Sequence, residues 1–315
     1  MAEKLAGKKT SDMDITIPLF SEICLKIGPV ITNGEGYPTS RLQKGLILIS
    51  NGQELAEEGV GFGVPVLKRG VKTIFPGRIE LACLEEGSRH EIAAIFFMNL
   101  EERLTSQSLG SVKSRSLYWI KNHLADVYRR FPPARGPLTA ISNTLRSSFG
   151  WQTTFEEAGC NYAVKVNYTV DSQAGVIVVD VDATGVPEDG APKDGAPKDG
   201  ALKDGALKDG APKVGGTEVI LMNEQGAHHF DTYSDSSGVL LRGEAIGSWD
   251  EVTAERAYFL SSTQRLAFTL QQIDGARLFR GRELIGSRLA WSGFGYCLLP
   301  TSRRFSYTLG IERLA

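Results

Sequence analysis

The sequence predicts a mainly β protein: a large antiparallel β-sandwich, or supersandwich, with a central two-helix insertion. Apolar and polar residues alternate with a period of two along much of the chain, as in strands with one buried face. Turn-forming groups such as NGEG, NGQ, NEQG and DSSG separate many of these segments. Without the N-terminal tail and a low-complexity repeat, about 275 of the 315 residues remain, too many for a sandwich of about 100 residues. Two large sheets packed face to face would accommodate them.

The individual strands are predicted from the same alternation. The clearest is Cys160–Val170, in which cysteine, tyrosine and valine side chains share one face and mostly polar side chains share the other. Arg78–Leu84 and His90–Asn99, joined by the turn-like EEGS, form a predicted hairpin. Further strands are predicted at Gly45–Asn51, Val176–Ala183, Thr217–Asn223, Arg256–Ser261, Gln264–Gln271 and Phe305–Ile311.

Residues 111–149 are the exception to the β pattern. Leu117, Ile120 and Leu124 begin an apolar series at helical spacing, which continues until two consecutive prolines stop it. A second, shorter helix is predicted after Pro137. The segment therefore reads as a two-helix unit inserted between strands.

A repeat of five units, DGAPK or DGALK, occupies Asp189–Lys213. Each unit has a charged pair and a glycine and no apolar face, so we expect a disordered loop over residues 187–214. Strand-like segments flank the loop on both sides, which favours one domain over residues 15–315 rather than two. Residues 1–14 mix charged and small residues without an apolar stretch, and we expect a flexible tail with no secretory signal.

The composition excludes several classes of partner. There are 35 Lys and Arg residues against 37 Asp and Glu, a net charge of −2, which does not favour binding to nucleic acid. The longest apolar run, Ile92–Met98, is far shorter than the roughly 20 residues of a spanning helix, so no membrane contact is expected. The four cysteines are scattered singly, without a CxxC pair or a Cys/His cluster. We therefore expect reduced thiols, a cytoplasmic location, no metal and no cofactor; the oligomeric state is left open.

The segment GVGFG, Gly59–Gly63, looks superficially like a nucleotide-binding loop. Val64, Pro65 and Val66 follow it where a helix N-terminus would have to receive the phosphate. Its glycines instead predict a β-bulge or a close approach of strands.

In size and strand density, residues 15–315 resemble the β-supersandwich of galactose-mutarotase-like proteins and the sandwich domains of some polysaccharide lyases. No motif of those families matches residue by residue, so the resemblance implies no catalytic residues. It implies a sheet face that binds sugars, although a fold is a poor guide to function.

The densest polar cluster is AHHFDTYSDSSG. If Ala227–Tyr233 is a strand, then His229, Asp231 and Tyr233 project from one face. A carboxylate beside an imidazole is the outline of an oriented general base, and a tyrosine hydroxyl can donate to a sugar. A solvated sheet face would explain the same residues without any site.

A second cluster lies in RLFRGRELIGSRLAWSGFGY. Alternation places Glu283 among apolar neighbours, where desolvation raises the pKa of a carboxyl group, with Arg280 and Arg282 on the opposite face. Trp291 and Tyr296, together with Trp249, are candidates for stacking against a sugar ring. The alternatives are an ordinary Glu–Arg pair and aromatic residues in the core.

These candidates lead to two hypotheses from different classes. The first is a protein that binds or acts on a carbohydrate or acidic sugar, with His229, Asp231 and Glu283 as acid/base groups. Ten arginines and no lysine from Val214 to Ala315 suit an anionic sugar, because a guanidinium binds carboxylate and phosphate in a bidentate way. The second is a protein-interaction or assembly module without enzymatic activity. The sequence leaves open whether the protein is an enzyme.

Overall fold

The computed structural model describes residues 14–20, 22–29, 41–69, 72–106, 151–187, 216–247, 249–285 and 288–314. The predicted two-helix insertion lies outside these residues. So do the predicted repeat loop, except for its first residue, and the N-terminal tail, except for Asp14. The single-domain organisation also stays a prediction.

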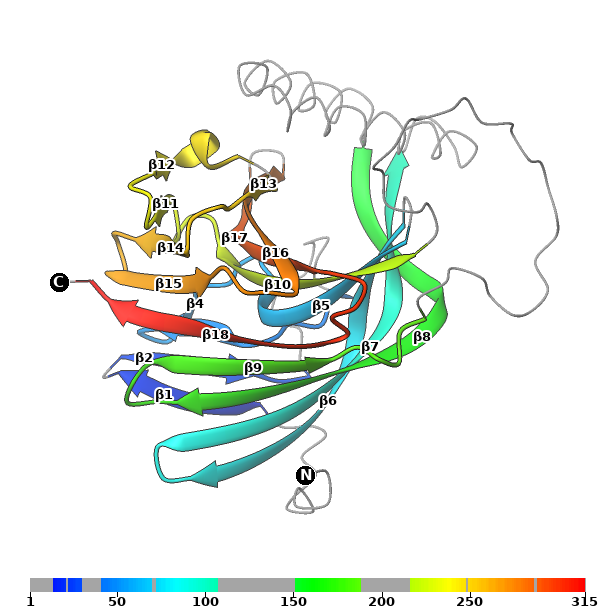
Figure 1. Ribbon diagram of the computed structural model, residues 1–315, viewed down its shortest axis with the longest axis horizontal. Coiled ribbons are helices and arrows are strands. Elements are labelled where there is room, and N and C mark those ends of the chain that lie inside the picture. The colour runs from blue at the N-terminus through cyan, green and yellow to red at the C-terminus, as the bar shows by residue number, and fades with distance from the viewer. Residues whose placement is uncertain are drawn as a thin grey trace.

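Within the described residues, fourteen strands form one antiparallel sheet and four strands form a second one (Figure 1). In sheet order, the strands of the large sheet are β12 (Leu240–Arg242), β11 (Thr232–Asp235), β14 (Arg256–Ser261), β15 (Leu266–Gln271), β18 (Arg304–Arg313), β9 (Val176–Asp182), β8 (Trp151–Asp171), β7 (Arg89–Ser106), β6 (Lys72–Glu86), β5 (Gly61–Arg69), β10 (Thr217–Gly226), β17 (Arg288–Leu298), β16 (Ala276–Ile285) and β13 (Asp250–Glu251). A short 3-10 helix, η5 (Gly243–Ile246), follows β12. The mainly β prediction is confirmed.

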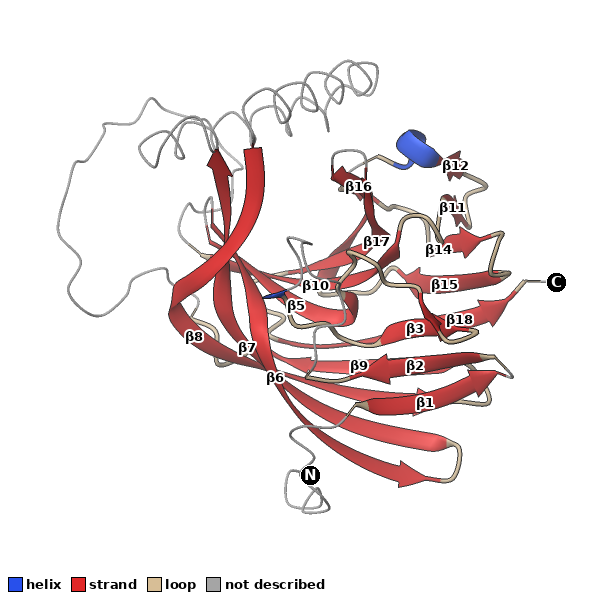
Figure 2. Cartoon of the chain, turned by 180° about the vertical axis from the view of Figure 1, so that it is seen from behind, coloured by secondary structure: helices blue, strands red, loops and turns tan. Residues whose placement is uncertain are grey.

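The small sheet has the order β1 (Ile15–Phe20), β2 (Ile23–Ile27), β3 (Ile47–Ser50) and β4 (Gln53–Glu54). Strict alternation of buried and more exposed residues along β1 and β2 shows that one face is turned to the core. The turn between β8 and β9 lies against this sheet, since a Cβ atom at Gly175 would be 2.9 Å from the ring of Phe20. Figure 2 shows the small sheet from behind, overlying β8 and β9.

The large sheet turns back on itself, and aromatic rings fill the space between its two halves. Phe268 of β15 lies 5.2 Å from the ring centroid of Phe62 of β5, although five strands separate β15 from β5 in the sheet. Tyr296 of β17 and Tyr307 of β18 meet in the same way at 4.9 Å. Such tilted and edge-on pairs add about 0.5–1.5 kcal/mol each beyond the apolar area that they bury. The β-sandwich character is therefore confirmed.

A group of hydrogen bonds crosses this core at the bulge in β5. The register of β5 against β10 shifts beside Asn223, and Gly63 has a φ of +75° there. Tyr168 of β8 donates to the carbonyl group of Phe62 (3.1 Å), and Tyr307 donates to Oδ1 of Asn223 (2.7 Å). The same Oδ1 accepts the backbone N–H of Gly63 (3.1 Å). The bulge and close strand approach predicted for GVGFG are confirmed.

The longest predicted strands are also found. Cys160–Val170 lies inside β8, with alternate residues buried, and the predicted hairpin is β6 and β7. The assignment of NEQG as a turn was wrong, because Asn223 to Gly226 complete β10. Asn223, Glu224 and Gln225 stay in the strand because their side chains accept the backbone N–H groups of Gly63, Val60 and Leu48.

We expect Gly63→Ala to destabilise the protein strongly. The added Cβ atom would lie 2.6 Å from the ring of Tyr168, at a backbone angle that L residues rarely adopt. Gly52→Ala is the matched control, since Gly52 has a similar φ of +78° and a Cβ atom added there would meet no other atom within 4 Å. Urea unfolding should show a loss of about 1 kcal/mol for the control and a further loss of about 1–3 kcal/mol for Gly63→Ala. Equal losses would contradict the role given to the Tyr168 contact.

Candidate functional site

One face of the β10–β17–β16 ribbon combines carboxyl groups, glycines and tryptophans. Glu224 pairs with Gly293, and Gly226 pairs with Trp291, which in turn pairs with Glu283. Directly paired residues, and residues two positions apart along a strand, point to the same side of a sheet. We call this surface the tryptophan face. Its members are Glu224, Gly226, Gly281, Glu283, Trp291, Gly293 and Gly295, together with Trp249, which lies on them.

Glycines make room on this face for the indole rings. A Cβ atom at Gly295 would overlap the ring of Trp249, and one at Gly281 would lie 3.0 Å from the ring of Trp291. The two indole rings are 5.5 Å apart between centroids and tilted by 53°. Trp291 is 8% exposed, whereas Trp249 is half-buried. Trp249 is therefore the ring that a ligand can reach.

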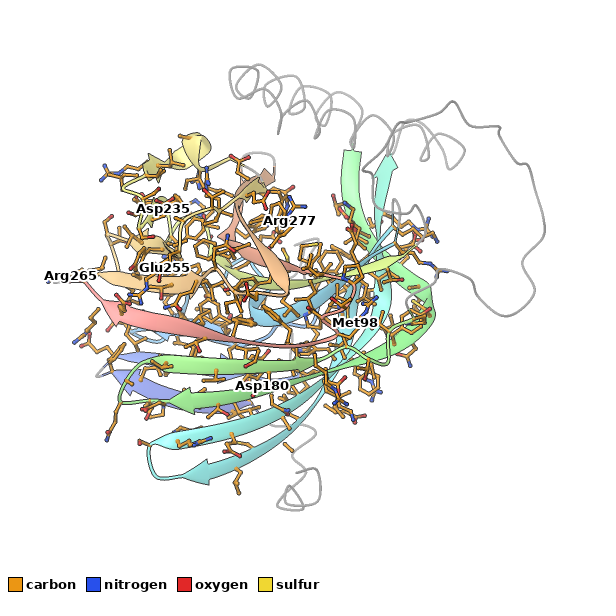
Figure 3. The ribbon with its side chains drawn as sticks, in the orientation of Figure 1. Met98, Asp180, Asp235, Glu255, Arg265 and Arg277 are labelled. Carbon is orange, nitrogen blue, oxygen red and sulfur yellow. The ribbon has the colours of Figure 1, made fainter. Side chains whose placement is uncertain are left out.

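The backbone of Trp249 is strained and is fixed by its neighbours. Its φ of +60° is rare for a bulky residue and costs on the order of 1–3 kcal/mol. The following strand, β13, is fastened to β16 by Arg277, which binds Glu251 through two hydrogen bonds of 2.9 and 2.7 Å. Arg280 adds a contact of 3.5 Å to Asp250. Figure 3 shows Arg277 beside β13 and β16.

Glu224 is a fully buried carboxyl group on this face. Its Oε2 accepts the backbone N–H of Val60 at 3.3 Å, and its Oε1 has no hydrogen-bond partner among the described residues. Burial, together with the nearby charge of Glu283, raises the pKa of Glu224 from 4.5 to about 8, although the hydrogen bond from Val60 partly opposes this shift. Glu224 is consequently protonated at neutral pH. The half-buried Glu283, its electrostatic neighbour, is the carboxyl group of this pair that solvent can reach.

A second acidic group, Glu57, lies at the rim of the tryptophan face with two histidines. Nδ1 of His228 is 3.1 Å from Oε1 of Glu57, and Nε2 of His229 is 3.6 Å from the same oxygen. A Cβ atom at Gly226 would be 2.6 Å from Oε2 of Glu57, which places this carboxylate over Gly226. Burial lowers the pKa of His229, and Glu57 partly opposes that shift. The imidazole of His229 is therefore mostly neutral at pH 7.

Lys44 helps to hold the loop that carries Glu57. Its Nζ donates to the backbone carbonyl of Glu57 at 2.7 Å, and the loop continues to Val60, the hydrogen-bond donor to Glu224. Burial lowers the pKa of Lys44 to about 8, although the charges of Glu54, Glu58 and Glu57 partly oppose this shift. The loop therefore links both acidic groups at this end of β10.

The expected strand over Ala227–Tyr233 was wrong. Ala227 to His229 form a turn in which Gly226 accepts the backbone N–H groups of His229 and Phe230, and β11 starts only at Thr232. Phe230 and Tyr233 both pack into the aromatic core, 5.0 Å from Phe268 and 5.8 Å from Phe259 respectively. Residues three positions apart would point to opposite faces of a regular strand, so the chain has to turn here. His229, Asp231 and Tyr233 are consequently not aligned on one strand face.

The structure places the other candidate residues in different surroundings. Tyr233 is buried, donates to Asp235 at 2.7 Å and has the guanidinium group of Arg280 over its ring at 4.6 Å. Tyr296 is fully buried and donates to the carbonyl group of Gln271. Asp231 accepts a hydrogen bond from the hydroxyl group of Thr232 at 3.1 Å.

Arg280 and Arg282 project from β16 on the side opposite Glu283, as the alternation predicted. Arg280 donates from Nε to the carbonyl group of Ile246 at 3.1 Å, and its side chain is only 15% exposed. Of the nine candidates, the structure thus brings Glu283, Trp249 and Trp291 together, with His229 at their rim.

Glu224 and Glu57 were missed by the sequence analysis. The sequence does contain a signal for Glu224, because a charged residue between two polar ones directly follows the apolar strand segment Val219–Met222. The interpretation of NEQG as a turn prevented its recognition as a site residue. No local sequence signal marks Glu57 as a site residue, because its partner His228 is 171 positions away in the chain.

Several further findings bear on the kind of site. Within the described ranges, no three His, Cys, Asp or Glu side chains are arranged to hold a metal ion. The four cysteines, Cys24, Cys83, Cys160 and Cys297, are free thiols. In the described part of the chain, no helix has the length and apolar character needed to cross a membrane.

Comparisons with known proteins give distant structural similarities. No protein-family model and no curated protein matches the sequence. The chain is similar to the α-N-acetylgalactosaminidase NagBb from Bifidobacterium bifidum, with a TM-score of 0.45 and 10% identity over 96% of this chain and 36% of that one. An α-mannosidase from Enterococcus faecalis V583 gives 0.42 and 6% identity, with coverage of 98% and 30%. The Slr1438 protein from Synechocystis sp. PCC 6803 gives 0.38 and 7% identity, with coverage of 97% of both chains.

The chain thus spans about a third of the length of the two glycosidases. The described fold is of one class: a β-rich protein built from large antiparallel sheets.

The raised pKa of Glu224 predicts a pH-dependent stability. Between pH 4.5 and about 8 the folded protein keeps a proton that the unfolded chain releases, so raising the pH favours unfolding. The free energy of unfolding should fall by at most about 1.4 kcal/mol per pH unit from this group. Glu224→Gln removes the titration while keeping the shape of the side chain. Urea unfolding at pH 5.5, 6.5 and 7.5 should therefore show a smaller decline for Glu224→Gln than for the wild type.

Glu218→Gln is the control for this series, because Glu218 is an exposed carboxylate on the same strand. Its decline with pH should follow that of the wild type. A constant difference between Glu224→Gln and the wild type at all three pH values would refute the assignment.

Proposed function

We propose that this protein binds a carbohydrate on the tryptophan face. The observation that carries the proposal is the half-buried ring of Trp249, fixed in a strained conformation over a glycine floor, on the same face of the sheet as Glu283. An aromatic ring suits the apolar C–H side of a sugar, and a neighbouring carboxylate accepts hydrogen bonds from its hydroxyl groups. Strained backbone conformations cluster at ligand-binding and active sites, where the surrounding structure holds them in place.

The polar groups of the tryptophan face and its rim could also catalyse a reaction of the bound sugar. Glu224 holds a proton at neutral pH, so Glu283 does not face a second negative charge in the interior. Glu283 and the neutral imidazole of His229 are then two groups able to take a proton from a sugar hydroxyl group. Glu57, 3.6 Å from Nε2 of His229, would orient that imidazole and stabilise its protonated form. Acid/base chemistry on the bound sugar is the enzymatic version of this proposal.

The proposal assigns no anionic group to the ligand of this face. Arg280 and Arg282 lie on the other side of β16, and Arg280 is already bound to Ile246 and Asp250. A neutral sugar therefore fits the tryptophan face best.

Removal of the Trp249 ring should weaken sugar binding. We expect calorimetric titration with a panel of neutral mono- and oligosaccharides to find at least one ligand, whose affinity falls about tenfold or more in Trp249→Ala, equal to about 1.4 kcal/mol. Trp249→Phe, which keeps an aromatic face, should lose less. Tyr258→Ala is the control, because Tyr258 is a half-buried aromatic residue on β14, outside the tryptophan face.

Turnover is tested separately from binding. If the protein acts on its sugar, Glu283→Gln should abolish product formation while reducing affinity only modestly. If no sugar of the panel binds the wild type, or if Trp249→Ala binds as well as Tyr258→Ala, the carbohydrate proposal fails.

One observation favours the second hypothesis, a protein-interaction module. Among the described strands, β12 is the outermost one of the large sheet, and Leu240 on it is 59% exposed, with Val239 exposed beside it. An open strand edge with apolar side chains is a template for pairing with another chain. Light scattering after size-exclusion chromatography should then show an oligomer that Leu240→Lys dissociates, with Leu299→Lys as the exposed-leucine control. A monomer at all concentrations would exclude self-association through this edge.

A further inference from the structure

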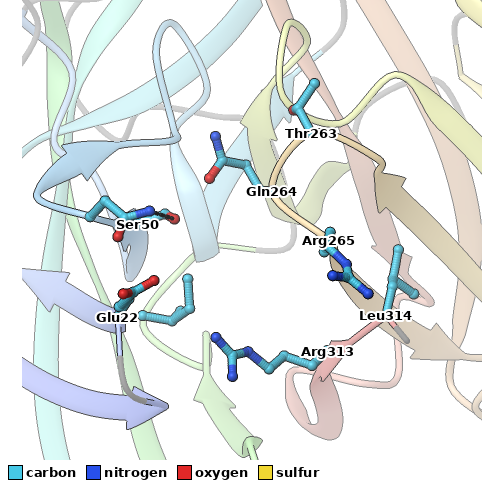
Figure 4. Close-up of a pocket in the computed structure, with 9 residues that line it drawn as sticks. Glu22, Ser50, Thr263, Gln264, Arg265, Arg313 and Leu314 are labelled. Atoms are coloured by element: carbon cyan, nitrogen blue, oxygen red, sulfur yellow. Dashed lines mark hydrogen bonds between the residues drawn. The ribbon is translucent and has the colours of Figure 1, made fainter.

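A hollow separate from the tryptophan face lies where the two sheets meet. One side of the hollow is formed by the turn before β2 and the turn after β3. The other side is formed by the turn between β14 and β15 and by the end of β18 (Figure 4). Its volume is about 380 Å³, within the range of about 300–1,000 Å³ that is typical of small-molecule sites. Nine residues line it: Glu22, Ile23, Ser50, Asn51, Thr263, Gln264, Arg265, Arg313 and Leu314.

Two arginines supply most of the charge of this hollow. The side chains of Arg265 and Arg313 border it together, with Glu22 on the opposite side (Figure 4). Neither guanidinium group forms an ion pair with a carboxylate among the described residues. Two other exposed arginines in this half of the chain differ, because Arg277 binds Glu251 and Arg304 approaches Asp182. The hollow therefore has a net charge of about +1 and free guanidinium donors.

The backbone around the hollow is fixed on both sides. Arg265 and Asn51 both have a φ of +51°, which is uncommon for residues other than glycine and especially so for arginine. The carbonyl group of Arg265 accepts the backbone N–H of Leu314 at 2.9 Å, and Asn51 donates from its backbone to Glu22 at 3.0 Å. These bonds fix the turn that carries Arg265 beside the end of β18 that carries Arg313. Both arginines thus line the same hollow from neighbouring, fixed segments of backbone.

The other residues that line the hollow would contact the uncharged part of a bound anion. Buried Ser50 and Ile23 form the floor, and the hydroxyl group of Thr263 and the amides of Asn51 and Gln264 add donors and acceptors. Guanidinium groups bind carboxylate and phosphate oxygens, whereas hydroxyl and amide groups bind the hydroxyl groups of a polyol.

We propose that this hollow binds a small hydroxylated oxyanion, a phosphorylated or carboxylated sugar, with Arg265 and Arg313 on its anionic group. This goes beyond the neutral-sugar proposal, because the two sites share no residue. A ligand here contacts turns of both sheets and stabilises their packing against each other.

The test is a titration of the full chain with glucose 6-phosphate, glucuronate, inorganic phosphate and glucose at constant ionic strength, followed by calorimetry and thermal unfolding. We expect saturable binding and a raised Tm with at least one of the two anionic sugars, at least tenfold weaker binding of inorganic phosphate, and no binding of glucose at this site. Arg265→Gln and Arg313→Gln should each weaken the binding at least tenfold. Arg304→Gln, on the same strand as Arg313, should leave it unchanged.

The Glu22→Gln variant should change the affinity for the anionic sugar in the opposite direction. Removal of this carboxylate from the hollow should tighten the binding of the anionic sugar, an effect that loss of folding cannot produce. The proposal is overturned if neither anionic sugar binds, if inorganic phosphate binds as tightly, if glucose binds as tightly to the Trp249→Ala variant, or if the Arg265→Gln/Arg313→Gln double variant binds like the wild type. Failure of Trp249→Ala to affect this titration is expected, so the two sites are tested independently.

Discussion

The packing of aromatic rings between the two halves of the large sheet is the constraint on which the rest of the structure depends. Fourteen described strands form one continuous sheet, and only the contact of β5, β10 and β17 with β14, β15 and β18 makes it a sandwich. Phe62, Phe259, Phe268 and Phe294 form the centre of that contact, and each is 1% exposed or less. Burial of such rings contributes about 25 cal/mol for each Å² of apolar surface removed from water. The turn of the sheet also decides which faces remain open to solvent.

The buried polar groups of β10 connect this core to the tryptophan face. Asn223 points into the sandwich and is satisfied by Gly63 and Tyr307, whereas Glu224, the next residue, points to the other side. A buried polar group without a partner costs about 1–3 kcal/mol, so these bonds make a polar strand end tolerable. Glu224 keeps one unpartnered oxygen and a raised pKa. A buried carboxyl group with an unpartnered oxygen destabilises the folded state, which favours a functional role for this end of β10 over a purely structural one.

Glycine has two different uses in the same region. Gly63 adopts a positive φ and allows the ring of Tyr168 to reach the backbone of β5. Gly281 and Gly295 lie in ordinary strands, and there the missing side chain makes room for the rings of Trp249 and Trp291. The first use fixes the sandwich, and the second leaves one indole ring half-buried over a flat floor. Both the stability of the core and the candidate sugar platform thus depend on the absence of a side chain at these glycines.

The sequence by itself determined the β class, the long hairpin of β6 and β7, the strand Cys160–Val170 and the bulge at GVGFG, because alternation and glycine clusters are local signals. It also placed Glu283 and the two arginines on opposite faces of β16, since the side-chain period of a strand is two. It did not determine the turn at His228 and His229, which exists because Phe230 packs against a ring of another strand. The pairing of Glu57 with these histidines, the burial of Glu224 and the position of Arg265 and Arg313 on one hollow depend on segments far apart in the chain. Only the tertiary structure decided them, because the contacts arise when the sheet turns back on itself and the small sheet packs against it.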